Sequence, residues 1–136
     1  MQTFTVSTPS RECFVDITQQ VAWAVAQEGG DAVLCTVFVP HTTAGVTLNE
    51  NADPDVTRDI LAHLAELVPR NRPYRHVEGN SDAHIKASLM GSGVQIPLED
   101  GRLLLGTWQG VYLAEFDGPR TRRVHVVVQG GTPAAP

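Results

Sequence analysis

Three of the five histidines are placed where an imidazole can bind a metal ion or transfer a proton, two of them flanked by small or polar residues and the third in a long irregular loop. They are His41, His76 and His84. Three imidazoles are a common set of metal ligands, and they leave positions open for water or substrate. We therefore expect a three-histidine metal site. The spacing of His76 and His84 is not a diagnostic metal motif, so the alternative for each histidine is a polar group at the surface.

Polar residues are also concentrated in the segment HTTAGVTLNENADPDV, which begins at residue 41 and lies between two apolar elements. Glu50 could act as a general base or orient a metal-bound histidine. Four further side chains of this segment could contact a substrate, although asparagine is also common in turns. These four are Thr42, Thr43, Asn49 and Asn51. Asp53 precedes Pro54 and suits the cap of a helix, so it needs no catalytic role.

A short helix is expected over residues 82–90, and it would present a second set of polar groups. His84 and Ser88 are four residues apart and share one face, while Ile85 and Leu89 share the adjacent face. If the apolar pair faces the core, His84 and Ser88 stand at its edge, where a pocket wall could form. Lys86 lies on the far side of that turn and either serves an anionic substrate or is solvated.

The segment GTWQG, at residues 106–110, and the arginines after residue 119 could contribute to binding. Trp108 could stack on a flat ring beside Gln109, although a large core or interface residue is the simpler interpretation. Arg120, Arg122 and Arg123 could bind phosphate, or they could form a solvated hairpin. Glu78 is an acid near the histidine segments that could assist a metal-bound histidine.

The hydrophobic pattern predicts a single α+β domain over residues 1–130, with mainly antiparallel sheet and about three helices. Strands are expected at 3–7, 14–17, 32–39, 45–48, 94–98, 102–105, 108–116 and 122–129. Helices are expected up to residue 28, ended by Gly29 and Gly30, then from Pro54 to Pro69, and over 82–90. Residues 69–80 form a long irregular loop, and residues 131–136 a mobile tail.

The second of these helices carries apolar residues at helical spacing, which predicts that one face packs on the core. They are Val56, Ile60, Leu64 and Leu67. His63 lies at the flank of this stripe, so we expect it to pack beside apolar neighbours. His125 alternates with two valines on a strand and points away from the core face.

Composition limits the classes of partner. The chain has 136 residues, of which 42% are hydrophobic and 18% charged, with a net charge of −5. This acidic balance argues against binding nucleic acid or anionic membranes. The N-terminal residues lack the basic start and apolar block of a signal peptide. The two cysteines, Cys13 and Cys35, lie in apolar runs without a C-x-x-C motif. We therefore expect no disulfide and a cytoplasmic location.

Three segments together resemble the YjbQ-like family, also called the secondary thiamine-phosphate synthase enzyme family. They are HTTAGVTLNEN followed by x-DP from residue 41, YRHVEGNSDAHIKASLMG from residue 74, and GRLLLGTWQGVYLAEFDGPR from residue 101. The resemblance implies a compact α+β fold that assembles as a homotrimer, with pockets near subunit boundaries. It also implies that His41, His76 and His84 are the shared histidines.

The activity that the resemblance implies joins a pyrimidine methyl diphosphate to a thiazole phosphate, an activity that the family name itself calls secondary. We expect a divalent metal at the three histidines, with Lys86 or Arg120 offsetting phosphate charge and Trp108 or Tyr74 stacking on a ring. Imidazoles suit zinc, whereas a diphosphate usually prefers magnesium, and no organic cofactor is expected. The alternatives are zinc-activated hydrolysis of a phosphate ester and a non-catalytic trimeric module that binds a small anion or metal.

Overall fold

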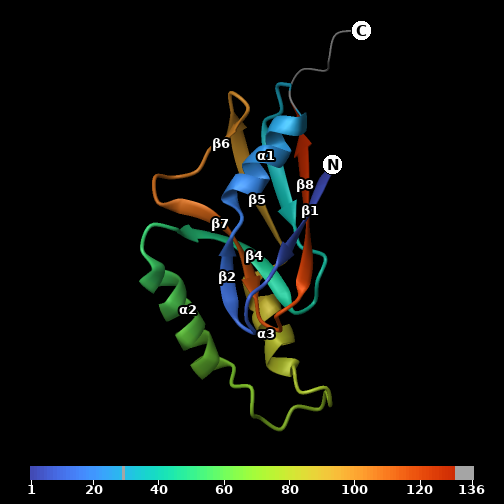
Figure 1. Ribbon diagram of the computed structural model, residues 1–136, viewed down its shortest axis with the longest axis vertical. Helices are drawn as coiled ribbons and strands as arrows, with labels where there is room; N and C mark the ends of the chain where they lie inside the picture. Colours follow the sequence, from blue (N-terminus) through green and yellow to red (C-terminus); the bar gives the residue numbers. More distant parts are fainter. Residues whose placement is uncertain (29, 131–136) are drawn as a thin grey trace.

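The computed structural model describes residues 1–28 and 30–130, which form an α+β fold of two antiparallel sheets and three helices (Figure 1). The predicted fold class is therefore confirmed. Residues 131–136, for which a tail was predicted, lie outside the described residues, and so does Gly29. Gly30, the second glycine of the expected helix stop, has a positive φ of 76°, which glycine adopts without strain.

The larger sheet has the strand order β1-β8-β3-β5-β6. Its strands are β1 (Gln2–Ser7), β8 (Thr121–Gln129), β3 (Leu34–Phe38), β5 (Gly93–Glu99) and β6 (Arg102–Leu103). Along β8, Arg122, Val124 and Val126 are buried at alternate positions, as the period of a strand requires. The side chain of Arg122 therefore lies on the core face of the sheet, and the expectation of three solvated arginines is wrong for this residue.

The smaller sheet has the order β2-β7-β4, with β2 (Cys13–Asp16), β7 (Gln109–Glu115) and β4 (Ala44–Glu50). The central strand, β7, is buried from Gly110 to Glu115 because both of its faces are covered: Val111 and Leu113 join the main core, and Ala114 joins the cluster around Phe116. Strand β4 lies at the sheet edge, and its backbone continues into the pocket-bearing segment before residue 44. This sheet therefore holds the segment that carries His41 and Thr42.

Helix α1 (Thr18–Glu28) buries Val21, Ala24 and Val25, which confirms the predicted face. These residues join a core whose fully buried members include Ile17, Cys35 and Leu113. Cys13 and Cys35 are free thiols, as expected. Within the described part of the chain, no helix has both the length and the apolar character that crossing a bilayer requires.

Helix α2 (Pro54–Leu67) begins as predicted, because the Asp53 carboxylate accepts a hydrogen bond from the Asp55 N–H at 2.9 Å. The predicted core stripe holds only in part, since Val56, Ile60 and Leu64 are half-buried and none of the residues of this helix is fully buried. Only partly buried residues of α2, including Leu61 and Leu64, pack against the small cluster around Phe116. Leu67 is 62% exposed. His63 is also exposed, 3.7 Å from Glu66, and not packed beside apolar neighbours.

Helix α3 (Ser81–Met90) is rotated relative to the expectation. Ile85 and Leu89, expected at the core, are 40% and 64% exposed. The buried residues are instead Asp82, Ala83, Lys86 and Ala87. The two alanines permit close approach to Phe116, and the two charged residues are paired. This helix lies beside the end of β4, where Val46 N–H donates to the Gly91 carbonyl at 3.1 Å.

Candidate functional site

An open pocket of about 490 Å³ lies where the segment before β4 meets α3. It is lined by His41, Thr42, Ala44, His84, Ala87, Ser88, Gly91 and Ser92. We call it the His41–His84 pocket. Its lining joins residues that are more than forty positions apart in the sequence. Thr42, His84 and Ser88, all predicted to belong to the site, are among these residues.

The imidazole of His41 is held by the backbone of β8. Its Nε2 accepts a hydrogen bond from the Arg123 N–H at 2.8 Å, so in the neutral ring the proton is on Nδ1. Partial burial and the charge of Arg122 lower the pKa of His41, with smaller effects of Arg123 and Arg120, and they outweigh the opposite effect of Glu115. His41 is therefore a neutral imidazole at pH 7 with one N–H to donate.

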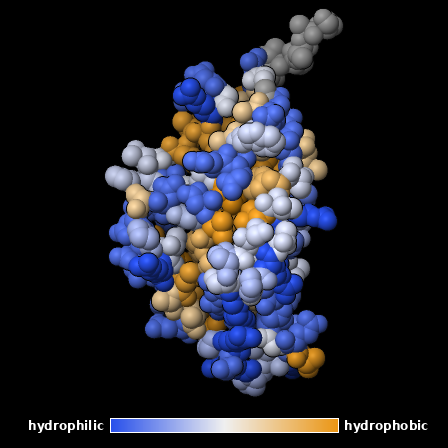
Figure 2. All heavy atoms as spheres, viewed as in Figure 1, coloured by the Kyte–Doolittle hydropathy of each residue, from blue (hydrophilic) through white to orange (hydrophobic). Residues whose placement is uncertain are grey.

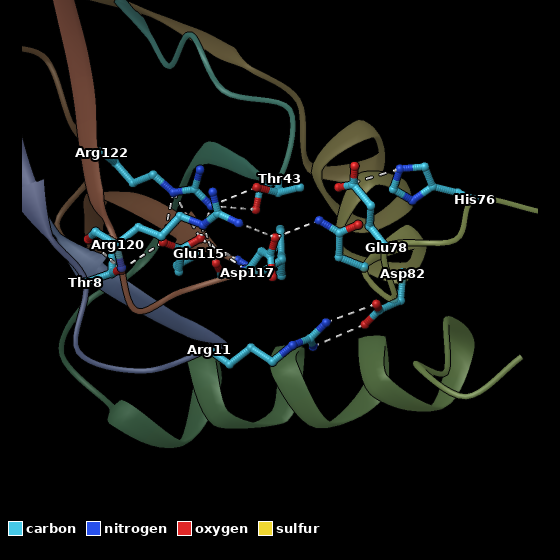
Figure 3. A network of polar contacts seen from close by, with 12 residues as sticks. Thr8, Arg11, Thr43, His76, Glu78, Asp82, Glu115, Asp117, Arg120 and Arg122 are labelled. Atoms are coloured by element: carbon cyan, nitrogen blue, oxygen red, sulfur yellow. Dashed lines mark hydrogen bonds and ion pairs between the residues drawn. The ribbon is translucent and has the colours of Figure 1, made fainter. Parts of the chain in front are cut away.

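Arg122 and Glu115, whose charges act on His41, form a buried ion pair with each other (Figure 3). The Arg122 guanidinium donates to both carboxylate oxygens of Glu115, and both side chains are almost fully buried. It also donates to the Thr43 hydroxyl at 2.9 Å, while the Thr8 hydroxyl donates to Glu115 at 2.8 Å. Thr43 is therefore a support of the pocket and does not line it. The network fixes the backbone that carries His41 and Thr42.

His84 lies next to His76, another of the three predicted metal ligands. Its ring lies edge-on to that of His76, with 5.3 Å between the ring centroids. His76 Nε2 is 3.9 Å from a carboxylate oxygen of Glu78, which pairs with it when the imidazole is protonated. The Ser88 hydroxyl donates to the His84 carbonyl at 2.9 Å. The long loop thus brings His76 next to His84 on α3. His76 does not line the His41–His84 pocket, so it lies on the other side of His84.

The donor groups of one chain do not fit the predicted metal site. Among residues 1–28 and 30–130, no three His, Cys, Asp or Glu side chains are grouped so that they could hold a metal ion. His41 Nε2 is already engaged by the Arg123 N–H. A single chain therefore does not assemble the predicted set of His41, His76 and His84, and we derive no reaction step through a metal.

Glu50 and its neighbours lie at the opposite end of β4 from His41. Strand β4 has seven residues, so its ends are about 20 Å apart at roughly 3.3 Å per residue. The Asn51 N–H donates to the Trp108 carbonyl at 3.0 Å, and the Asn51 amide donates to Asp16 at 3.3 Å. The interpretation of residues 41–51 as one wall of one site is therefore wrong for a single chain.

The remaining predicted residues of that end have structural contacts. The Gln109 side chain accepts from the Gly106 N–H at 2.8 Å and closes the turn before β7. The Asn49 side chain accepts from the Glu50 N–H at 2.8 Å. Trp108 is 63% exposed, so it is not a core residue. These groups form a second polar surface, separate from the His41–His84 pocket.

Comparison with known proteins identifies the family. The family model described as UPF0047 protein YjbQ-like matches residues 2–131. The chain belongs to the YjbQ-like family. It is 49% identical to the UPF0047 protein MJ1081 of Methanocaldococcus jannaschii, covering 93% of this chain and 92% of that one. It is 44% identical to YugU of Bacillus subtilis, covering 96% and 99%.

Solved structures of similar proteins share this fold. A crystal structure from Clostridium acetobutylicum has a TM-score of 0.92 at 55% identity, covering 95% of this chain and 100% of that chain. The conserved hypothetical protein TT1486 of Thermus thermophilus has a TM-score of 0.88 at 51% identity, covering 95% and 100%. The names of these relatives state no reaction, so function must be inferred from the site.

Lys86 of this YjbQ-like chain lies in neither of the expected places. It is 2% exposed and binds Glu12 at 2.5 Å and Asp82 at 3.2 Å, so it is not solvated, and the pocket lining does not include it. Arg11 donates twice to Asp82, at 3.1 and 3.3 Å. Burial alone would raise the pKa of Asp82, but the hydrogen bonds from Arg11 and Lys86 hold it below its ordinary value. This cluster anchors α3 to the start of β2.

Arg120 points to Asp117 and not into the pocket, with 2.7 Å between the guanidinium and the carboxylate. Neither Ser92 nor the role of Glu115 was predicted from the sequence. Arg122 shares the alternation of Val124 and Val126, which is a signal that its side chain faces inward and needs an acidic partner. For Ser92 we find no such signal, because its place depends on the turn between α3 and β5.

Proposed function

We propose that the His41–His84 pocket binds the phosphate or diphosphate group of a small molecule. The observation that supports this is the composition of the pocket: its lining residues offer two imidazoles and three hydroxyls and include no carboxylate. Arg122 is paired with Glu115, whose charge opposes its effect on His41, while Arg123 and Arg120 add positive charge near the same ring. Hydroxyl and N–H donors in a positive field are the groups that bind an oxyanion.

The reaction we propose is of the thiamine-phosphate synthase type. The carbon–oxygen bond to the diphosphate of a pyrimidine methyl diphosphate breaks, and the ring nitrogen of a thiazole phosphate forms a bond to the same carbon. Negative charge builds on the leaving oxygen, so fixed hydrogen-bond donors accelerate the step. His41 would donate through Nδ1–H, and Thr42, His84 and Ser92 would complete the donor set, because the Ser88 hydroxyl already donates to the His84 carbonyl. No general base is needed, because the attacking ring nitrogen carries no proton.

A second candidate is a module that binds a small anion without catalysis. It is favoured over hydrolysis by the position of Glu50 at the far end of β4, since this leaves no carboxylate in the described lining to act as a base. Hydrolysis of a phosphate ester would need such a base or a metal-bound water. The pocket therefore supports leaving-group stabilisation or simple binding better than hydrolysis.

The test mixes the purified protein with both thiamine precursors and measures thiamine phosphate. We expect product from the wild type and at least about a hundredfold lower rate from His41→Ala and from His84→Ala. His63→Ala is the matched control, because His63 is exposed on α2 outside the pocket, and it should keep the wild-type rate. Equal rates in all four proteins would exclude the pocket as the site.

The same proteins separate catalysis from binding. Calorimetric titration with inorganic diphosphate measures the pocket alone. Binding that His41→Ala abolishes, without product from the wild type, would support the binding module. A divalent metal, zinc or magnesium, stays a proposal, and the metal content of protein purified without a histidine tag tests it. Stoichiometric zinc that is lost in His84→Ala would support a site that this chain completes only with a partner.

A further inference from the structure

A second pocket, of about 290 Å³, shares His84 with the first. It is lined by Tyr74, Arg75, His76, Ser81, His84 and Ile85. We call it the Tyr74 pocket. Five of these six residues are absent from the lining of the His41–His84 pocket, and the Tyr74 pocket lies on the side of His84 that faces the long loop.

The walls of the Tyr74 pocket are held by the loop and by α3. The Tyr74 hydroxyl donates to the Pro69 carbonyl at 2.6 Å, and the Tyr74 N–H donates to the Arg72 carbonyl at 2.8 Å. The tyrosine ring is therefore fixed at both ends. His76 is edge-on to His84, which leaves the two imidazoles as adjacent sides of one pocket. Ile85 enters from the next position of α3.

The chemistry of these walls differs from that of the first pocket. Tyr74 and Ile85 provide an aromatic and an aliphatic surface, on which a flat ring can pack. Arg75 and Ser81 provide a cation and a hydroxyl, and the lining residues include no carboxylate. Such a set suits a planar heterocycle that carries an anionic group, whereas the hydroxyl-rich His41–His84 pocket suits the oxyanion alone.

We propose that the Tyr74 pocket binds the phosphorylated heterocycle that attacks, while the diphosphate of the other substrate occupies the His41–His84 pocket. His84 then lies between the two ligands, at the place where the new bond forms. This inference rests on the proposed function and adds the location of the second substrate. It also assigns the stacking side chain to Tyr74, because Trp108 lies at the far end of β4.

Ile85 and Leu89 offer a matched pair of variants for the test. Both are exposed aliphatic residues one turn apart on α3, but only Ile85 lines the Tyr74 pocket, and Leu89 lines neither pocket. Their replacement by alanine removes similar side chains from the same helix. A difference between the two variants therefore reports on the pocket and not on the stability of α3.

Two probes are titrated separately into the wild type and both variants: inorganic diphosphate and hydroxyethylthiazole phosphate. We expect Ile85→Ala to bind the thiazole phosphate about five- to tenfold more weakly, because aliphatic contact with the ring is lost. Its affinity for diphosphate should not change, and Leu89→Ala should bind both probes as the wild type does. His84→Ala should lose affinity for both.

Thiazole phosphate that does not bind the wild type at millimolar concentration, or that binds Ile85→Ala and wild type equally, would overturn the proposal. The proposed reaction can fail independently. Selective weakening in Ile85→Ala without any thiamine phosphate from the wild type would retain the ring pocket and exclude the reaction. Product formation with an unchanged KM for thiazole phosphate in Ile85→Ala would retain the reaction and place the ring elsewhere.

Discussion

The electrostatic environment of His41 is set by residues that do not line its pocket. Burial and the neighbouring arginines lower its pKa, so the unfolded chain binds a proton at a higher pH than the folded chain does. His41 therefore contributes stability that is present above its unfolded pKa and is lost as the pH falls toward its folded pKa. The same shift keeps the ring neutral where the proposed chemistry takes place.

We predict that Arg123→Gln raises the pKa of His41 toward its ordinary value, because one of the nearby charges is removed while the backbone N–H that binds Nε2 remains. Titration followed by NMR of the His41 ring protons measures this directly. Arg58→Gln, which removes an exposed arginine of α2, is the control and should leave the His41 titration in place. A pKa that does not move in Arg123→Gln would show that Arg123 makes no contribution and that burial and Arg122 account for the shift.

Lys86 is the clearest case of a buried charge whose removal should destabilise the fold. It contacts Glu12 and Asp82, and Asp82 is fully buried. We predict that Lys86→Met lowers the free energy of unfolding by about 3 kcal/mol, because a buried carboxylate loses a partner. Arg58→Met breaks the exposed pair with Asp55 and should cost under about 1 kcal/mol. Urea unfolding compares the two, and equal losses would contradict the buried pairing.

At the scale of elements, strand and helix positions were predictable because periodicity and caps are local. Asp53 and Pro54 fix the start of α2, and the alternating valines fix β8. The direction in which α2 and α3 face was not predictable. On α3, Ala83 and Ala87 are buried because small residues allow close packing, and Asp82 and Lys86 are buried because Arg11 and Glu12 meet them from the residues before β2. Partners so far apart in sequence leave no periodic signal.

In the candidate site, too, residue types were predictable from the sequence and their relative positions were not. His41, Thr42, His84 and Ser88 were recognisable from residue type and family resemblance, and they do line one pocket. The sequence did not show that Glu50 lies far from these residues. The seven residues of β4 place it about 20 Å away because they form an extended strand. In sequence the same residues are simply neighbours.

The close contact between β4 and the end of α3 leads to a prediction at this scale. A Cβ at Gly45 would lie 2.5 Å from the Gly91 carbonyl oxygen, which is shorter than any ordinary contact. We predict that Gly45→Ala costs about 2 kcal/mol of stability and weakens diphosphate binding, because α3 must move away from the pocket. Gly93→Ala, whose Cβ would have no atom nearer than 3.5 Å, should change stability by less than about 0.5 kcal/mol. Thermal unfolding and diphosphate titration of both variants decide between these outcomes.

The single chain combines a low content of charged residues with several large apolar side chains that are exposed to solvent. Charged residues are 18% of the chain, and Figure 2 shows apolar residues open to solvent across the middle of one face. Trp23, Leu67 and Trp108 are all more than half exposed in the single chain. Large exposed apolar groups of this kind are typical of surfaces that a partner covers.

We predict that the protein in solution has the mass of three chains of 14.7 kDa, the trimer that the family resemblance implies, as light scattering after size exclusion will measure. The two tryptophans report whether assembly covers apolar surface. In the single chain Trp23 is 56% exposed and Trp108 is 63% exposed. If assembly covers apolar surface, acrylamide will quench the fluorescence of at least one of them less than these exposures predict. Trp23→Phe and Trp108→Phe each leave one reporter, which assigns the covered residue. A monomeric mass with full quenching of both would contradict the trimer and leave each pocket complete within one chain.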